Sequence, residues 1–464
     1  MMPPVSLPRR SLLGLGLAAA TAAVAGCAEQ PSNRWSTGSA TPAGTTPGRT
    51  AASTSAGPAG TAPRVAVSPT SGPPLAAGYG PRVETVLRRY LAPTRENPDH
   101  PGYAGAVALT QVAGRQQVLV PVGEALRYGA GPVLLPADKR VAMRPDSIFD
   151  LASITKVYTA ILLLQQVDAG RLDLAAPVVD YLPGFTGTGK STVTVSMLLT
   201  HSSGLPVGAK VTGYSSDAER WAAVLATPLV SGAVPGTVFR YSSVGLMVAG
   251  KLVEKVTGQR LDQALKTQLT DPLGLRWTGF NPDTWLSGTD RATRLVATDA
   301  RTSRGLLRGV VHDDVANHLG GIAGHAGIFS TAQEVAVIGQ LLLDGGTFNG
   351  RRILAESTVR RMLGNANAGL PAVDPERPNR TSDHGLGVVL DQPWFMGRLS
   401  SAATFGHTGF TGTSLLVEPR RRLVLVLLTN RAHPNWSWAD PDPTRVDVAD
   451  VVGSAVRPGT RLGR

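Results

Sequence analysis

Apolar segments with the residue pattern of β-strands lie near both ends of the domain-sized part of this chain, and they constrain its fold most. Ala104 to Val112 and Gln117 to Val122 are predicted as paired strands, and Ser414 to Val417 and Leu423 to Leu428 as two more. Helical patterns fill the region between. This order predicts an α/β fold whose sheet is closed by the C-terminal strands, with an inserted helical region.

Apolar residues at helical spacing predict the helices of this domain. The first follows Pro81, where Val83, Val86, Leu87 and Tyr90 share one face. The other predicted helices are Ser153 to Val167, Val193 to Leu199, Gly245 to Val256 and Asp447 to Val456.

The first 27 residues have the features of an export signal. The basic pair Arg9-Arg10, which resembles a twin-arginine signal, precedes the apolar run Ser11 to Gly26, which is too short to span a membrane. The run ends at Val24-Ala25-Gly26-Cys27, which looks like a bacterial lipobox. Cys27 is the single cysteine of the chain, so intramolecular disulfides and zinc sites built from cysteines are excluded. We therefore expect a signal peptide over residues 1–27 and lipidation at Cys27, the alternative being an ordinary signal peptide with an incidental cysteine.

Residues 28–77 contain little besides Ala, Gly, Pro, Ser and Thr. Such a segment buries too little apolar surface to offset its ordering entropy, so it is predicted to be a disordered tether. With a lipid anchor it would hold the domain predicted over residues 78–460 at the outer face of the cell membrane.

The formal net charge of +12 is spread along the chain, mostly as arginine. Nucleic-acid binding is not predicted, because no basic patch is interleaved with aromatic residues. Attraction to an anionic cell envelope is sufficient to account for the charge, and arginine-rich composition is the alternative.

A serine and a lysine three residues apart are the first indication of chemistry. Ser153 and Lys156, in Phe149-Asp150-Leu151-Ala152-Ser153-Ile154-Thr155-Lys156, would lie on one face at the start of a helix. Hydroxyl and amine could then meet, and burial beside the positive helix end would lower the lysine pKa toward that of a base. The alternative is a surface lysine that follows a serine by chance.

Two further segments extend this candidate site. Tyr241, in Phe239-Arg240-Tyr241-Ser242-Ser243, could supply a second acid/base hydroxyl. In Phe405-Gly406-His407-Thr408-Gly409-Phe410, Gly409 would allow close approach of a strand to substrate. The N–H groups of Phe410 and Ser153 could together form an oxyanion hole. Each segment is weak by itself, since a lone tyrosine is usually a core residue and Thr-Gly usually a turn.

With these segments in their order, the chain resembles the serine β-lactamase and penicillin-binding-protein superfamily, on the branch of class C β-lactamases, D-alanyl-D-alanine carboxypeptidases and esterases. The resemblance covers about residues 80 to 455 and implies an antiparallel sheet flanked by helices. Further segments that match the superfamily are Leu198 to Pro206, Pro235-Gly236, Pro272 to Leu275 and Ala323 to Thr331. Val311 to Asp313 and Leu428 to Pro434 look like a subgroup that includes cell-wall N-acetylmuramyl-L-alanine amidases.

The resemblance implies roles residue by residue. Ser153 would be the acylated nucleophile, Lys156 its base and Tyr241 a second proton shuttle, while His407, Thr408, Gly409 and Phe410 would line the substrate strand. Two positions depart from the family pattern. Ser243 stands where the family often has Asn, so a side-chain amide contact to the substrate carbonyl is lost or left to a bridging water. His407 stands where β-lactamases usually have Lys. A histidine, mostly uncharged near neutral pH, binds a substrate carboxylate less firmly than a lysine, so efficient hydrolysis of β-lactams is less expected.

The sequence therefore predicts an exported serine hydrolase acting on amide or ester bonds of a small-molecule or peptidoglycan-fragment substrate. No cofactor or metal is expected. The alternatives are a β-lactamase or general carboxylesterase of the same fold, and a non-catalytic peptidoglycan-binding sensor. A zinc amidase is also considered because His312, Asp313, His318 and His325 lie close in sequence, although the spacing of helical zinc ligands is missing.

Overall fold

The computed structural model describes residues 79–374 and 380–456. They belong to the second of the two units into which the chain divides, Pro63–Arg464. The predicted signal peptide with Cys27 and the predicted tether over residues 28–77 lie outside the described residues. Among the described helices, none has the length and apolar character needed to cross a bilayer.

A seven-stranded antiparallel sheet joins the two ends of the domain, as the sequence predicts. Its strand order is β13-β14-β15-β16-β1-β2-β5, so the first long strand pairs with the last, with Ala108 opposite Leu427. Its strands are β1 (Gly105–Val112), β2 (Arg115–Leu126), β5 (Val141–Ala142), β13 (Val389–Leu390), β14 (Phe405–Thr408), β15 (Ser414–Glu418) and β16 (Leu423–Thr429).

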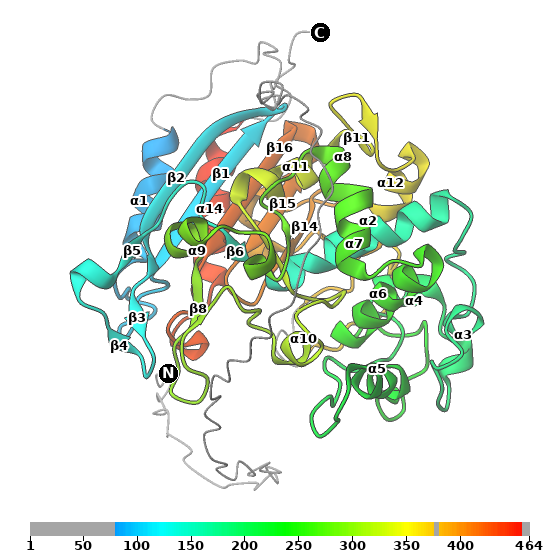
Figure 1. Cartoon of the computed structure of the whole chain (residues 1–464). Coiled ribbons are helices and arrows are strands. Elements are labelled where there is room, and N and C mark those ends of the chain that lie inside the picture. The colour runs from blue at the N-terminus through cyan, green and yellow to red at the C-terminus, as the bar shows by residue number, and fades with distance from the viewer. Residues whose placement is uncertain (1–78, 375–379, 457–464) are drawn as a thin grey trace, which may run out of the picture. The chain divides into compact units, whose positions relative to one another are not determined.

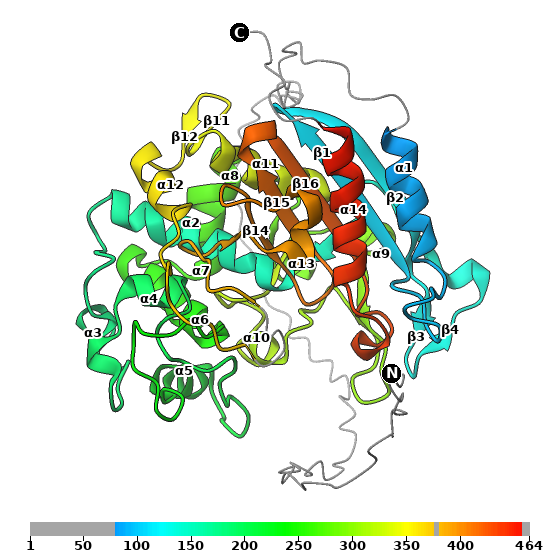
Figure 2. The ribbon, with the colours of Figure 1, turned by 180° about the vertical axis from the view of Figure 1, so that it is seen from behind.

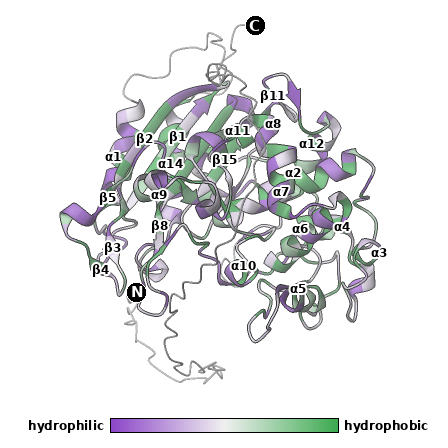
Figure 3. Ribbon diagram, in the orientation of Figure 1, coloured by the Kyte–Doolittle hydropathy of each residue, from purple (hydrophilic) through white to green (hydrophobic). Residues whose placement is uncertain are grey.

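Both faces of the sheet are buried, because alternate residues of each central strand enter different cores. On β1, Val107 and Leu109 join the larger core, whereas Ala106 and Ala108 join the smaller one. The smaller core lies under α1 (Tyr79–Arg89), α13 (Pro393–Met396) and α14 (Asp442–Ala455), on the face seen in Figure 2. Helix α11 (Ala332–Leu343) packs on the opposite face, seen in Figure 1. The central strands are accordingly mainly apolar in Figure 3.

Helix α2 (Thr155–Asp168) is buried on nearly all sides between the sheet and the inserted helical region (Figure 1). It contacts α6 (Ser243–Thr257), which in turn packs on α4 (Val195–Leu199). The other α-helices of the described residues are α3 (Val178–Tyr181), α5 (Asp217–Ala226), α7 (Leu261–Leu265), α8 (Asp271–Leu273), α9 (Gly288–Arg294), α10 (Asp314–His318) and α12 (Glu356–Met362).

The short strands form small sheets apart from the large one. One small sheet has the order β6-β10-β7 and leads directly into the turn before α2. The short strands are β3 (Tyr128–Gly129), β4 (Val133–Leu134), β6 (Phe149–Asp150), β7 (Gly279–Phe280), β8 (Ala297–Asp299), β9 (Leu307–Arg308), β10 (Ile328–Ser330), β11 (Thr347–Phe348) and β12 (Arg351–Arg352).

The predicted elements differ from the observed ones mainly at their ends. Helix α14 begins at Asp442 rather than Asp447, because Asp442 and Pro443 suit a first helical turn although neither belongs to the apolar pattern. Helix α2 begins at Thr155, since Ala152–Ile154 form a separate 3-10 turn, η2, that carries Ser153.

Candidate active site

Ser153 lies in a strained turn between β6 and α2. Strand β6 pairs with β10, which fixes the approach to the turn. Ala152 then adopts a φ of 47°, a left-handed conformation that costs energy for a residue with a side chain. Its N–H donates to Asp150 Oδ1 at 2.8 Å. The strand, the strained residue and this hydrogen bond together set the position of the serine.

Asp150 links this turn to a second segment of the site. It is fully buried, and its Oδ2 accepts a hydrogen bond from the His312 N–H at 2.7 Å. Burial raises the pKa of Asp150 to about 6, against the opposing effect of the two N–H donors. In the sequence, Asp150 stands out only as part of the segment that leads to Ser153 and Lys156, because nothing in the local pattern shows which distant backbone group it binds.

Lys156 lies one helical turn after Ser153, as the spacing predicts. Its Nζ donates to Ser153 Oγ at 2.7 Å and to the His325 carbonyl oxygen at 3.1 Å. The side chain is fully buried, so the amine contacts protein groups rather than bulk water. Helix α2 therefore presents hydroxyl and amine together.

Tyr241 completes a three-residue contact. Its Oη donates to Ser153 Oγ at 3.1 Å, and Lys156 Nζ lies 5.1 Å from the centre of its ring. The structure thus brings together Ser153, Lys156 and Tyr241, three residues that span 88 positions of the sequence.

His201 was not predicted as a site residue, yet it contacts Tyr241 and both of its neighbours. The carbonyl oxygen of His201 accepts from the Arg240 N–H at 2.8 Å, and its Nδ1 accepts from the Ser242 N–H at 3.1 Å. The imidazole lies 4.6 Å from the Tyr241 ring, centre to centre. Burial, with the nearby His384 ring and Lys156, holds the pKa of His201 well below its ordinary value, so Nδ1 remains an acceptor.

The end of β14 lies against the Ser153 turn. A side chain at Gly409 would meet Thr413 Oγ1 at 2.1 Å and the Leu151 carbonyl oxygen at 2.4 Å, so the backbones approach too closely for any other residue. Thr411 Oγ1 donates to the Asp150 carbonyl oxygen at 2.8 Å. These contacts place Phe410, whose N–H is the expected oxyanion-hole donor, beside the same cavity as Ser153.

His407 is buried and neutral. Its Nδ1 donates to the Thr408 carbonyl oxygen at 2.8 Å, and burial, reinforced by the charge of Lys156, lowers its pKa to about 3. An exposed imidazole titrates near about 6.5, so burial beside the lysine keeps this ring neutral to a lower pH than usual. His407 therefore offers no positive charge to a carboxylate near neutral pH.

A cavity of about 510 Å³ opens beside Ser153. Besides Ser153 and Tyr241, the predicted residues Ser243, His407, Thr408, Gly409 and Phe410 line it, so the structure brings these predicted positions together. The remaining lining residues are Pro206, Val207, Val230, Arg240, Asp313, Val373, Asp374, Arg380, Val389, Trp394, Arg431, Pro441 and Arg445.

Asp313 and His325 form a pair next to the lysine. His325 Nε2 and Asp313 Oδ1 are 3.0 Å apart, and the same oxygen accepts from the Ala316 N–H at 2.8 Å. Burial alone would raise the pKa of Asp313, but the His325 charge and hydrogen bond outweigh it and hold the pKa well below its usual range. Since the His325 carbonyl oxygen also accepts from Lys156, the pair fixes one partner of the amine.

Of the four residues considered as zinc ligands, Asp313 and His325 pair with each other, whereas His312 and His318 have other partners. His318 Nδ1 bonds to the Asp314 carbonyl oxygen at 2.7 Å, while the His312 ring lies 5.3 Å from that of Phe410. Within residues 79–374 and 380–456, no group of three or more His, Cys, Asp or Glu side chains is arranged to hold a metal ion.

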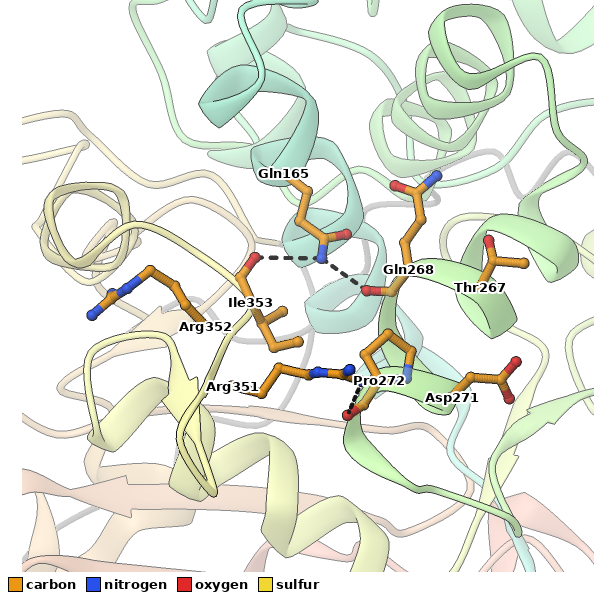
Figure 4. Close-up of a pocket in the computed structure, with 8 residues that line it drawn as sticks. All are labelled: Gln165, Thr267, Gln268, Asp271, Pro272, Arg351, Arg352 and Ile353. Atoms are coloured by element: carbon orange, nitrogen blue, oxygen red, sulfur yellow. Dashed lines mark hydrogen bonds between the residues drawn. The ribbon is translucent and has the colours of Figure 1, made fainter.

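A second cavity, of about 500 Å³, lies at the far end of α2 (Figure 4). Gln165 Nε2 donates to the carbonyl oxygens of Gln268 and Ile353, and Arg351 donates to that of Pro272. These bonds join the β11–β12 hairpin to the neighbouring helices, and the cavity is lined by neither serine, lysine nor histidine. The candidate active site is therefore the cavity beside Ser153.

A serine in contact with a buried lysine and a tyrosine, at the junction of a sheet and a helical region, defines an acylating serine hydrolase. The chain belongs to the Beta-lactamase family, whose model matches residues 117–450. A protein of Escherichia coli (strain K12), provisionally named a D-alanyl-D-alanine carboxypeptidase, is 33% identical over 343 residues, which are 67% of this chain and 74% of that protein. An N-acetylmuramyl-L-alanine amidase of Bacillus subtilis (strain 168) is 31% identical over 377 residues, 76% of this chain and 81% of the amidase.

Among solved structures, a penicillin-binding protein homolog from Caulobacter crescentus superposes with a TM-score of 0.60. Its sequence identity is 21%, and the match covers 83% of this chain and 100% of that chain. This likeness confirms the predicted fold, an antiparallel sheet with flanking helices and a helical insertion.

Proposed function

We propose that this protein is an exported, lipid-anchored hydrolase that cleaves amide or ester bonds of peptidoglycan-derived substrates through an acyl-enzyme on Ser153. The single observation that carries the chemistry is that Lys156 Nζ and Tyr241 Oη lie 2.7 and 3.1 Å from the same oxygen, Ser153 Oγ. The peptidoglycan substrate is supported by the two relatives, whose names refer to a carboxypeptidase and an amidase of cell-wall peptides.

In the first half-reaction, Lys156 acts as the base and takes the proton of Ser153 Oγ as that oxygen attacks the substrate carbonyl carbon. The negative charge that develops on the carbonyl oxygen is stabilised by the N–H groups of Ser153 and Phe410. Tyr241 gives its proton to the leaving nitrogen or oxygen, the bond to that atom breaks, and the acyl group stays on Ser153.

In the second half-reaction a water molecule attacks the acyl carbon. Tyr241, which lost its proton in the first half-reaction, accepts a proton from this water. The tetrahedral centre collapses, and Ser153 Oγ leaves and regains its proton from Lys156. The Asp313–His325 pair contributes by holding the carbonyl oxygen that accepts from Lys156, which keeps the amine directed at Ser153.

The test is a panel of purified muropeptides, simple esters and a chromogenic cephalosporin, offered side by side to the wild type and to Ser153→Ala. We expect release of the peptide or terminal residue from muropeptides, slow or absent cephalosporin turnover, and no turnover by the variant. A serine-directed fluorophosphonate should add its mass to the wild type alone. Turnover that survives Ser153→Ala, or that a chelator abolishes, would contradict the proposed chemistry.

A further inference from the structure

The cavity beside Ser153 has more positive than negative side chains. Its charged lining residues are the four arginines Arg240, Arg380, Arg431 and Arg445 and the two aspartates Asp313 and Asp374. Both aspartates already have a side-chain partner: Asp313 contacts His325, and Asp374 pairs with Arg380 at 3.0 Å. Since His407 is neutral, the arginines are the lining residues that offer a positive charge to a negatively charged substrate.

Three of these arginines already bind other groups of the protein. Arg445 donates to the carbonyl oxygens of Gly409 and Thr413 at 2.8 and 2.9 Å. The Arg380 side chain is 6% exposed and holds Asp374. Arg431 lies over the Phe410 ring at 4.5 Å and donates to a backbone carbonyl group. Their guanidinium groups therefore support the cavity wall.

Arg240 differs from these three. It directly precedes Tyr241, and its N–H donates to the His201 carbonyl oxygen, so its backbone position is fixed. Its half-buried side chain lines the cavity, yet within residues 79–374 and 380–456 no hydrogen bond or ion pair involves its guanidinium group. A guanidinium group presents a planar fork of donors that matches a carboxylate with two parallel hydrogen bonds.

We propose that Arg240 binds a free carboxylate of the substrate, outside the bond that is cut, and thereby selects anionic acyl compounds or leaving groups. The inference rests on the proposed function, because it assigns the substrate class of the same cavity. It also explains how this chain could recognise an anionic cell-wall peptide although its β14 strand carries a neutral histidine.

The test uses two matched pairs of simple esters, which keep it independent of any muropeptide. The first pair is mono-para-nitrophenyl suberate and its methyl ester, in which the carboxylate is on the acyl side. The second is meta-carboxyphenyl acetate and its methyl ester, in which it is on the leaving group. KM and kcat are measured for the wild type, Arg240→Gln and Arg240→Lys, with Arg82→Gln on α1 as the control for net charge.

For at least one pair, we expect Arg240→Gln to raise the KM of the free acid about ten-fold or more and to change that of its methyl ester less than about two-fold. Arg240→Lys should retain part of the preference, and Arg82→Gln should retain all of it. An equal change within each pair, or no change in either, would overturn the assignment. Failure of the wild type to hydrolyse any of the four esters, together with no activity on muropeptides, would instead contradict the proposed function.

Discussion

The imidazole of His201 lies against the ring of Tyr241 while its backbone and side chain bind the residues on either side of that tyrosine. His201 itself has a φ of 57°, which is costly for most residues but tolerated best by Gly and Asn. His201 thus keeps a strained backbone and binds both neighbours of Tyr241. We infer that it positions the Tyr241 phenol.

Replacing His201 should therefore reduce kcat more than it changes KM. His201→Ala leaves the buried Ser242 N–H without an acceptor, which costs ~1–3 kcal/mol, and frees the Tyr241 ring. We expect kcat to fall by about ten- to a hundred-fold, and His201→Asn, which keeps an acceptor and tolerates the backbone, to recover most of it. If the two variants fold equally well and lose the same activity, the positioning role is refuted.

Replacing Lys156 should remove the base without collapsing the site. Lys156→Met retains most of the buried volume but has no amine, so turnover should fall by at least ~10² fold. Fluorophosphonate labelling of Ser153 should slow in parallel, as followed by intact mass. Lys251→Met, on the neighbouring helix α6, is the matched control and should leave labelling unchanged.

Asp150 should make stability depend on pH. Its folded-state pKa of about 6 is raised above the unfolded value of about 3.8, so the folded state binds the proton more tightly. The stability that this proton contributes is fully present below about pH 3.8 and is lost as the pH rises through about 6. Two pKa units correspond to about 3 kcal/mol. Urea unfolding of the wild type and Asp150→Asn at several pH values measures this. The difference in unfolding free energy between the wild type and Asp150→Asn should change over this pH range. A difference that does not change with pH would contradict the raised pKa of Asp150.

His407 should remain neutral from about pH 5 to 8, because burial lowers its pKa to about 3. Its ring nitrogen resonances should not move over that range in long-range proton–nitrogen NMR spectra. His407→Asn should accordingly leave the pH profile of KM for an anionic ester unchanged. A titration step near pH 6.5 that disappears in this variant would contradict the neutral state.

The lipid anchor can be tested separately from catalysis. Cys27→Ser should release the protein from membranes and leave its specific activity unaltered, since the predicted lipid site precedes the enzyme domain. Membrane fractions washed with high salt distinguish an anchor from electrostatic adsorption. A variant that still sediments after this wash would require another means of attachment.

The sequence predicted the pairs of long strands, helices α1, α2, α4, α6 and α14, and the contact between Ser153 and Lys156, because these depend on local periodicity and short spacing. It did not predict α5 or α11. It did not reveal the roles of His201, Asp150 or Asp313, whose hydrogen-bond partners lie at distant positions of the chain. No sequence motif could show that His407 is neutral, because its neutral state follows from burial beside Lys156. Local sequence patterns identify the candidate reacting residues, whereas tertiary packing determines their surroundings and thereby their pKa values.

The pairing of β1 with β16 also determines when this enzyme can fold. Gly105 donates to Asn430 Oδ1 across 325 residues, so the middle of the sheet is completed by a segment that is synthesised long after β1. Contacts this distant in sequence slow folding, because a long loop must close before they form. A nascent chain that stops before Leu423 lacks the strand between β15 and β1. Products truncated before β16 should therefore remain open to proteases, and active enzyme should form only after β16 has been synthesised.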